Sequence, residues 1–188
     1  MQTDISATDE DIARAVQEGD ADAFGTIVER YEPKLSRYAR KFLTGYDDIT
    51  DAIQDVFIKV YENIQSYDAK RPFSPWIYRI AHNELVNILR KRKRQPISLF
   101  DPDTIFPHPV AKETADGEVI REELSREMER DLEKLDEKYR EPIVLYYYED
   151  MDYKAIAEIL RIPVSTVGVR IARGKKQLLA YRTQHEHD

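Results

Sequence analysis

Basic side chains gather near the end of a chain whose formal net charge is −7. The stretch STVGVRIARGKK, residues 165–176, contains four basic residues and no acidic one. Arginine and lysine on one face of a helix can pair with guanine edges and with phosphates in the major groove of DNA. The side chains that we expect to face DNA are Ser165, Thr166, Arg170, Arg173, Lys175 and Lys176.

The basic stretch is part of a longer pattern, YKAIAEILRIPVSTVGVRIARGKKQLL, which is typical of a helix-turn-helix. The apolar spacing predicts a short helix, a tight turn at 161–163 and a second helix. Gly174 lies on the apolar side of the second helix, where it would let a neighbouring helix approach closely. The plain alternative is a solvated basic helix in an ordinary bundle. The two helices are expected to bury Ile156, Ala157, Leu160, Val167, Ile171 and Leu178.

A second basic region is the unbroken run 90–94, RKRKR, at the end of another amphipathic segment. We expect a helix from Pro75 to about Lys93, because Ser74 is a favourable N-cap and proline a favourable first helical residue. Its apolar side would carry Ile77, Ala81, Leu85 and Ile88, and its polar side Arg79, Asn83, Asn87 and Arg90.

The periodic segments have helical spacing, so the predicted fold class is all-α, with two small helical domains. Periodicity disappears over 95–118, where four prolines and a net negative charge indicate an extended linker between domains 1–94 and 119–188. Pro33 predicts a kink or a restart of its helix, and the run IVLYYY is interpreted as a buried helix. The other expected helices run from the cap Thr8 to Glu18, from the cap Asp20 to Phe42, from Asp47 to Ile64, from Val119 to Leu135, from Tyr139 to Tyr148, from Tyr153 to Leu160 and from Pro163 to Tyr181.

The composition argues against an enzyme. The chain has no cysteine, and its four histidines are not spaced with carboxylates as metal ligands would be. No Gly-rich phosphate loop and no nucleophile–base pair is recognised, so we predict no catalytic residue, no metal site and no cofactor. The sequence also shows no signal peptide and no apolar run long enough to span a membrane. We therefore expect a cytoplasmic binding protein without membrane insertion.

Three segments, in order, resemble the extracytoplasmic-function (ECF) sigma factors of bacterial RNA polymerase. They are DITDAIQDVFIKVYENI, RPFSPWIYRIAHNELVNILRKRKR and LDEKYREPIVLYYYEDMDYKAIAEILRIPVSTVGVRIARGKKQL. The resemblance implies a σ2-like domain that binds core polymerase and melts the −10 element, and a σ4-like domain that recognises the −35 element. The implied partners are core RNA polymerase at its clamp and flap regions, promoter DNA and an anti-sigma factor.

The first segment of the resemblance implies a polymerase-binding helix. Asp51, Gln54 and Asp55 match the positions that bind the clamp, and their polar side chains would meet basic groups of the polymerase. Phe57 also falls in this motif, but we expect it in the core.

The second segment implies recognition of the −10 element. Asn83 matches the asparagine that recognises a −10 base, and the preceding loop would accept a flipped base. For Trp76 two alternatives stay open, a place in the core and a place near the melted strand, whereas Tyr78 is expected to be the exposed ring. The predicted contacts of this region are Lys70, Arg71 and Phe73 in the loop, and Trp76, Tyr78, Arg79, His82, Asn83, Asn87 and Arg90 on the helix.

The chain departs from the family pattern at a few positions. Gly168 and Val169 stand where a basic and a small polar residue are common, which removes one basic contact. Arg161 replaces a turn glycine, and Pro142 indicates that its helix begins nearby. The alternative function is a stand-alone helix-turn-helix regulator whose N-terminal helical domain dimerises or senses a ligand. Co-purification with core polymerase would separate the two.

Overall fold

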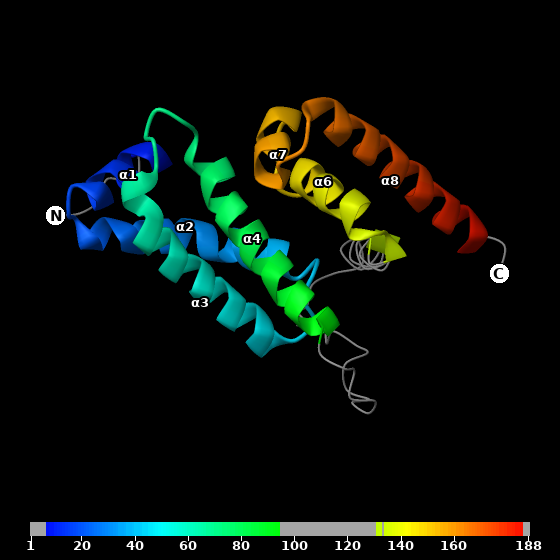
Figure 1. Ribbon diagram of the computed structural model, residues 1–188, viewed down its shortest axis with the longest axis horizontal. Helices are drawn as coiled ribbons and strands as arrows, with labels where there is room; N and C mark the ends of the chain where they lie inside the picture. Colours follow the sequence, from blue (N-terminus) through cyan, green and yellow to red (C-terminus); the bar gives the residue numbers. More distant parts are fainter. Residues whose placement is uncertain (1–6, 95–130, 133, 186–188) are drawn as a thin grey trace, which may run out of the picture. The chain divides into compact units, whose positions relative to one another are not determined.

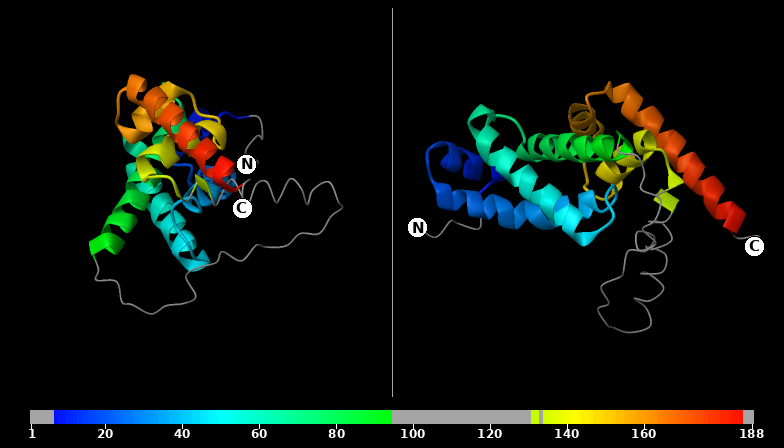
Figure 2. Two further views of the ribbon diagram at one scale, coloured as in Figure 1. Left: turned by 90° about the vertical axis from the view of Figure 1, so that its right-hand side faces the viewer. Right: turned by 60° about the horizontal axis from the view of Figure 1, so that its bottom comes forward.

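The structure, a computed structural model, describes residues 7–94, 131–132 and 134–185. These residues form helices and no strand, so the predicted all-α class is confirmed for them. Packing divides the chain into two compact units, Met1–Pro102 with Glu158–Leu160, and Asp103–Ala157 with Arg161–Asp188 (Figure 1, Figure 2). The predicted linker, 95–118, and most of the predicted helix Val119–Leu135 lie outside the described residues.

The first two helices begin at the caps that the sequence predicts. Helix α1, Asp9–Gln17, starts after Thr8, whose hydroxyl accepts the N–H of Asp11 at 3.2 Å. Gly19 follows this helix with a φ of 103°, a conformation that glycine adopts without a Cβ clash. Helix α2, Ala21–Ala39, is capped by Asp20, whose carboxylate accepts the N–H groups of the two residues after Ala21.

Helix α2 continues through Pro33 as one helix, so the predicted restart is absent. Proline removes one backbone donor, and here its ring is exposed to solvent rather than packed inside the bundle. The helix ends at Ala39, before the predicted end at Phe42. Phe42 lies in the turn that follows, with its ring 5.1 Å from that of Tyr38, so it keeps a place beside the core without being helical.

Helix α3, Tyr46–Asn63, continues into the short 3-10 helix η1, Ile64–Ser66, and a loop leads to helix α4, Phe73–Arg94. The predicted N-cap Ser74 is therefore wrong, because Ser74 lies within the first turn of α4. The N–H of Phe73 instead donates to the Glu10 carboxylate of α1 at 2.8 Å. A side chain from a distant helix thus satisfies a backbone donor that a local cap was expected to serve.

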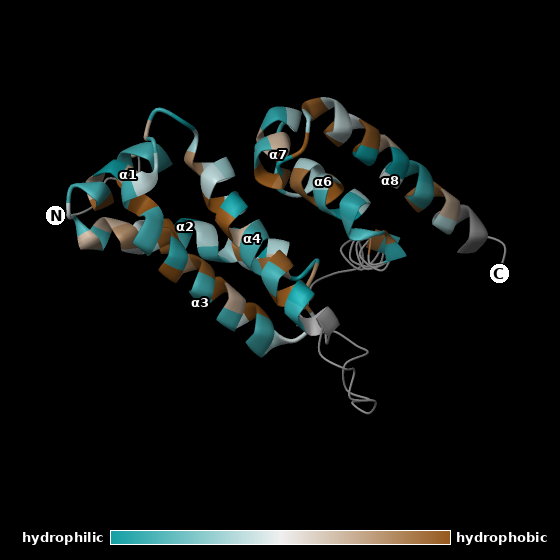
Figure 3. Ribbon diagram, viewed as in Figure 1, coloured by the Kyte–Doolittle hydropathy of each residue, from teal (hydrophilic) through white to brown (hydrophobic). Residues whose placement is uncertain are grey.

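The four α-helices of the first unit pack around one apolar core, with α1 and α3 against α2, and α4 against α3 (Figure 1). Helices of both units alternate between hydrophobic and hydrophilic positions along their length (Figure 3). Four rings from three different segments form an aromatic cluster with centroid separations of 5.1 to 5.5 Å. The members of this cluster are Tyr31, Tyr67, Phe73 and Trp76.

The second unit contains helix α6, Glu137–Tyr147, the first five residues of helix α7, Tyr153–Leu160, and helix α8, Val164–His185. The carboxylates of Asp136 and Asp152 cap α6 and α7 by accepting backbone N–H groups at 3.1 and 2.7 Å. Pro142 lies buried inside α6, so the expectation that this helix begins near the proline is wrong. Within the described part of the chain, no helix is both long enough and apolar enough to cross a membrane.

Candidate nucleic-acid interface

Helices α7 and α8 form the predicted helix-turn-helix (Figure 1). Arg161 in the turn adopts φ 53° and ψ 46°, the left-handed conformation that usually favours glycine. The N–H of Arg161 and the N–H of Ile162 both donate to the carbonyl of Ala157, which closes the end of α7. The turn therefore has the tight geometry expected from the sequence, with a strained arginine in it.

Gly174 sets the distance between α6 and α8. A Cβ at this position would lie 2.5 Å from Ile143 Cδ1 and 3.3 Å from Tyr139 Cβ, both on α6. The first contact is closer than real Cβ atoms come, and the second is tighter than most, so a side chain at this position would require the Ile143 side chain to shift. The prediction that Gly174 serves helix packing is confirmed.

The apolar stripe of α8 faces inward, and most of its basic residues face outward. Val167, Ile171 and Leu178 are buried as predicted. On α7, Ile156 is buried with Ile159, a residue not selected from the sequence, whereas Ala157 and Leu160 are only half-buried. Of the predicted DNA contacts on α8, Ser165, Arg173, Lys175 and Lys176 are exposed, and Thr166 and Arg170 are half-buried.

An exposed tyrosine patch adjoins α8, and the sequence analysis missed it. Tyr146 lies 4.8 Å from Tyr147 and 5.2 Å from Tyr153 between ring centroids. All three rings are at least a third exposed, so the expectation that the whole IVLYYY run is buried is wrong, although Ile143, Val144 and Leu145 are buried. The helical spacing of the run contained the signal, because a helix buried on one side cannot bury six consecutive residues.

The patch contacts the predicted DNA-facing residues of α8. The Lys175 ammonium lies 5.6 Å from the Tyr147 ring centroid, a distance suited to a cation–π contact. A hydrogen bond with Tyr147 raises the pKa of Lys175 above its ordinary value, so the lysine is charged at neutral pH. A Cβ at Gly168 would lie 3.4 Å from the Tyr153 ring, which is ordinary contact.

The polar side of α4 is a second candidate surface. Asn83, Asn87 and Arg90 are exposed, while Arg79 and His82 are half-buried. The opposite side is buried at Ile77, Ala81 and Leu85, as predicted, and Ile88 is half-buried. The helix therefore presents two amides and one cation, one turn apart, away from the core.

The neighbour of Asn83 fixes α4 to α3. The Glu84 side chain is 7% exposed and forms an ion pair with Lys59 of α3. A buried carboxylate without a partner is costly, so this pair restrains the helix next to the exposed amide.

Two predicted −10 contacts belong to the core. Phe73 is fully buried as the first residue of α4, not part of the loop, and Tyr78 is 1% exposed, so the expectation of an exposed Tyr78 ring is wrong. Tyr78 points toward α2, where its ring lies 5.5 Å from that of Tyr38. Trp76 is also buried, which agrees with the core alternative. In this conformation the Phe73 and Tyr78 side chains offer DNA no surface.

The loop before α4 carries two exposed cations, Lys70 and Arg71. Its backbone is folded into a turn around Asp68. The N–H of Lys70 donates to the Asp68 carboxylate at 3.0 Å, and the N–H of Arg71 donates to the Asp68 carbonyl at 2.9 Å. Both long side chains therefore extend from a closed turn.

The outer side of α3 is polar with an apolar centre. Asp51, Gln54 and Asp55 are exposed as predicted, and Phe57 is buried as expected. Ile58 and Tyr61, which the sequence analysis did not select, are 56% and 52% exposed. The outer side of α3 therefore combines exposed carboxylates with two large, partly exposed apolar side chains.

Comparison with known proteins assigns each unit to a family region. The family model for Sigma-70 region 2 matches residues 27–95, and that for Sigma-70, region 4, matches residues 125–178. The chain is 37% identical over 173 residues to the ECF RNA polymerase sigma factor SigW of Bacillus subtilis, covering 88% of this chain and 91% of that protein. It is 33% identical over 177 residues to the ECF RNA polymerase sigma-E factor of Haemophilus influenzae, covering 91% and 93%.

Two solved structures are similar to this chain over most of its length. CnrH in complex with the cytosolic domain of CnrY matches with a TM-score of 0.71 and 28% identity, covering 94% of this chain and 97% of that one. The sigma factor RpoE in complex with the anti-sigma factor NepR from Bartonella quintana matches with a TM-score of 0.68 and 22% identity, covering 82% and 93%. At that lower identity, the second match concerns the fold alone.

Proposed function

Because the chain belongs to the ECF sigma factors of RNA polymerase, we propose that it directs core polymerase to promoters through two DNA-binding helices, one in each unit. The observation that carries the proposal is that each family region supplies one helix with a buried apolar side and an exposed polar or basic side. These helices are α4 in region 2 and α8 in region 4.

Helix α8 is proposed to bind the −35 element. As the second helix of a helix-turn-helix it has the shape that enters the major groove, and it exposes Arg173, Lys175 and Lys176. Arginine can pair with guanine through two hydrogen bonds, and lysine neutralises phosphates. The tyrosine patch beside it would add hydroxyl donors and ring surface at the edge of the same contact.

Helix α4 and the loop before it are proposed to recognise and open the −10 element. Asn83 and Asn87 offer amide donors and acceptors for base edges, and Arg90 offers a cation for the backbone. Lys70 and Arg71 are proposed to hold a base that leaves the stack. Opening costs a few kcal/mol per base, which these contacts and the polymerase would offset.

The outer side of α3 is proposed to bind the polymerase clamp. Asp51, Gln54 and Asp55 would pair with basic groups there, and Ile58 and Tyr61 would form the apolar centre that such interfaces contain. Region 4 is proposed to contact the flap. The chain then works as a binding subunit in the cytoplasm, and the polymerase performs the chemistry.

An anti-sigma factor is proposed as a further partner. The similar sigma factor RpoE was solved with the anti-sigma factor NepR, and CnrH was solved with the cytosolic domain of CnrY. A protein that covers the exposed sides of α3, α4 or α8 would block the contacts proposed above.

The experiment that tests the function is transcription by core RNA polymerase with and without the full chain on a library of random promoter sequences. We expect transcripts to start downstream of a shared pair of elements only when the chain is present. A chain that binds its promoter specifically and at nanomolar affinity without polymerase would instead be an autonomous regulator.

A further inference from the structure

Helix α1 reaches the segment between α3 and α4, although it precedes the residues that match Sigma-70 region 2. The Gln17 amide nitrogen donates to the carbonyl of Ile64 at 2.7 Å and to the carbonyl of Tyr67 at 2.8 Å. The Gln65 amide nitrogen donates back to the carbonyl of Gln17 at 3.1 Å. One side chain of α1 therefore fixes the start of the loop 67–72.

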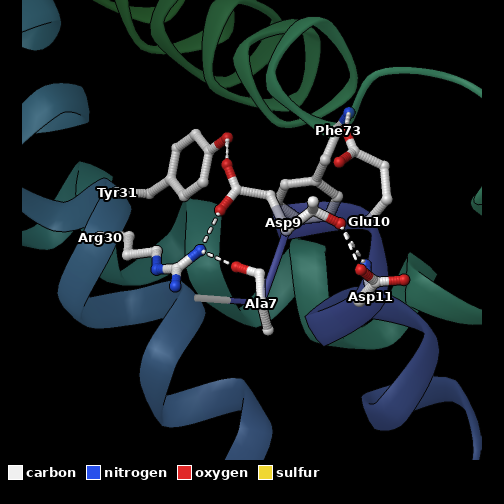
Figure 4. Close-up of polar contacts among 8 residues, drawn as sticks. Ala7, Asp9, Glu10, Asp11, Arg30, Tyr31 and Phe73 are labelled. Atoms are coloured by element: carbon white, nitrogen blue, oxygen red, sulfur yellow. Dashed lines mark hydrogen bonds and ion pairs between the residues drawn. The ribbon is translucent and has the colours of Figure 1, made fainter. Parts of the chain in front are cut away.

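A second side chain of α1 fixes the other end of this loop. The Glu10 carboxylate accepts the N–H of Phe73, the first residue of α4, at 2.8 Å (Figure 4). The first N–H groups of a helix have no partner within it, and their partial positive charge favours a carboxylate. Glu10 thus holds α4 where it begins.

The beginning of α1 is itself tied to α2. The Asp9 carboxylate accepts from the Arg30 guanidinium at 2.7 Å and from the Tyr31 hydroxyl at 2.6 Å (Figure 4). The same guanidinium donates to the carbonyl of Ala7 at 2.9 Å. Burial raises the pKa of Tyr31 far above its ordinary value, so its hydroxyl stays a donor. Glu10 is therefore presented by a helix end that cannot shift freely.

The loop between the two fixed ends is closed on itself. The Tyr67 hydroxyl donates to the carbonyl of Arg71, and burial raises the pKa of Tyr67 to about 12, which keeps this donor protonated. Lys70 and Arg71 are both exposed at this closed turn. A short loop held at both ends and across its middle has few conformations, and a prearranged contact loses less entropy on binding.

We propose that α1 is a brace that positions the loop 67–72, and that Gln17 and Glu10 are positioning residues for −10 recognition. The inference rests on the proposed function, in which Lys70 and Arg71 contact the −10 strand. Neither Gln17 nor Glu10 needs to touch DNA. Loosening the α1 brace changes which bases are preferred at the promoter position that the loop contacts. It leaves the proposed polymerase-binding side of α3 unchanged.

The test uses the full chain bound to core polymerase and a promoter library randomised across the −10 element. Gln17→Leu removes the bonds to the Ile64 and Tyr67 carbonyls, of which the second belongs to the loop, and Glu10→Leu removes the bond to α4. Each is expected to lower the preference for the best base at one position about fivefold, the effect of one hydrogen bond. Lys70→Ala and Arg71→Ala identify that position. Core affinity, measured in parallel, is expected to stay within twofold.

Two controls separate positioning from general damage. Gln65→Ala removes the bond from the Gln65 amide to the Gln17 carbonyl, which joins α1 to η1 without involving a loop carbonyl. This variant is expected to leave all base preferences unchanged. Glu10→Gln keeps an acceptor for the N–H of Phe73 and is expected to restore the preference lost in Glu10→Leu.

Three results would overturn the proposal that α1 is a brace. In the first, Lys70→Ala or Arg71→Ala changes a base preference and neither α1 variant does. In that case α1 does not position the loop, and the proposed function stands. If both α1 variants lose core binding, α1 is a general stability element. If the loop variants themselves change no base preference, the proposed role of α1 as a brace and the proposed role of the loop are both wrong.

Discussion

The first unit holds α4, its proposed DNA-binding helix, with polar side chains from two other helices. The second unit holds α8, its proposed DNA-binding helix, by the close approach of α6. Helix α4 is tied to α1 through Glu10 and to α3 through the Lys59–Glu84 ion pair. Helix α8 is held where Gly174 lets α6 approach. Hydrogen bonds and ion pairs can be removed singly, but a steric fit is lost as a whole. The position of α4 is therefore expected to be more easily adjusted by single substitutions than that of α8.

The two units also differ in their aromatic residues. The first unit buries Tyr31, Phe73 and Trp76 in one cluster. The second leaves Tyr146 and Tyr153 exposed beside its basic helix. The buried rings of the first unit therefore join three segments of its core, whereas the exposed rings of the second unit are available for contact with another molecule.

The largest effect is expected from breaking the ion pair of α4. Lys59→Met leaves the Glu84 carboxylate buried without its partner, and we expect the first unit to lose about 3 kcal/mol of unfolding free energy. The fluorescence of Trp76, the single tryptophan of the chain, reports this unit in a denaturant titration. Because two apolar residues can replace a buried pair at little cost, the double variant Lys59→Met with Glu84→Met is expected to recover most of the loss. An equal loss of unfolding free energy in the single and double variants would show that the Lys59–Glu84 ion pair does not hold α4 to α3.

The next effect concerns the fit between α6 and α8. Gly174→Leu forces side-chain atoms against Ile143 and Tyr139, and overpacking of this kind costs about 2 kcal/mol. Hydrogen exchange of the α8 amides measures the loss. Gly168→Ala is the matched control, since its Cβ would meet only ordinary contact, and it is expected to stabilise α8 by up to ~1 kcal/mol through helix propensity. Equal protection in the two variants would show that Gly174 is not a packing constraint.

A smaller effect is expected at the amides of α4. Asn83→Ala removes a donor and an acceptor from an exposed position, and we expect discrimination at one −10 base to fall by about 1.5 kcal/mol. Transcription from promoters that differ only in the −10 element measures this. Asn87→Ala, one turn away, is the comparison variant and should change a different base or none. A uniform decrease over all promoters would make Asn83 a backbone contact.

The sequence predicted the helices well because their caps and apolar spacing are local. Thr8, Asp20 and Gly19 mark helix ends in the structure as they do in the sequence. The start of α4 was wrong because its donor is satisfied by Glu10, more than sixty residues earlier, and local capping rules contain no such information. Tertiary packing decides the environment in the same way for Tyr78, whose ring meets Tyr38 of another helix.

The exposed residues of the candidate site were predicted where charge alone decides exposure. Asp51, Asp55 and Lys176 are exposed as expected, since burial of an unpaired charge is unfavourable. Ile58 and Tyr61 were missed because hydrophobicity predicts burial. In the packed structure both side chains are more than half exposed.

The smallest effect concerns the contrast between the amides of α4 and the cations of α8, which are both proposed to contact DNA. Gly168 leaves one position of the α8 surface without a side chain, and a Cβ there would make only ordinary contact with Tyr153. Gly168→Arg is therefore expected to be tolerated and to add one phosphate contact. The slope of log K against log salt for −35 duplex binding should steepen by about 0.9, as expected for one further neutralised phosphate. Gly168→Gln gains similar helix propensity without charge, so its slope should match the unsubstituted chain. If both variants gave the same slope, position 168 would lie away from the DNA backbone, and the proposed face of α8 would have to be rotated about the helix axis.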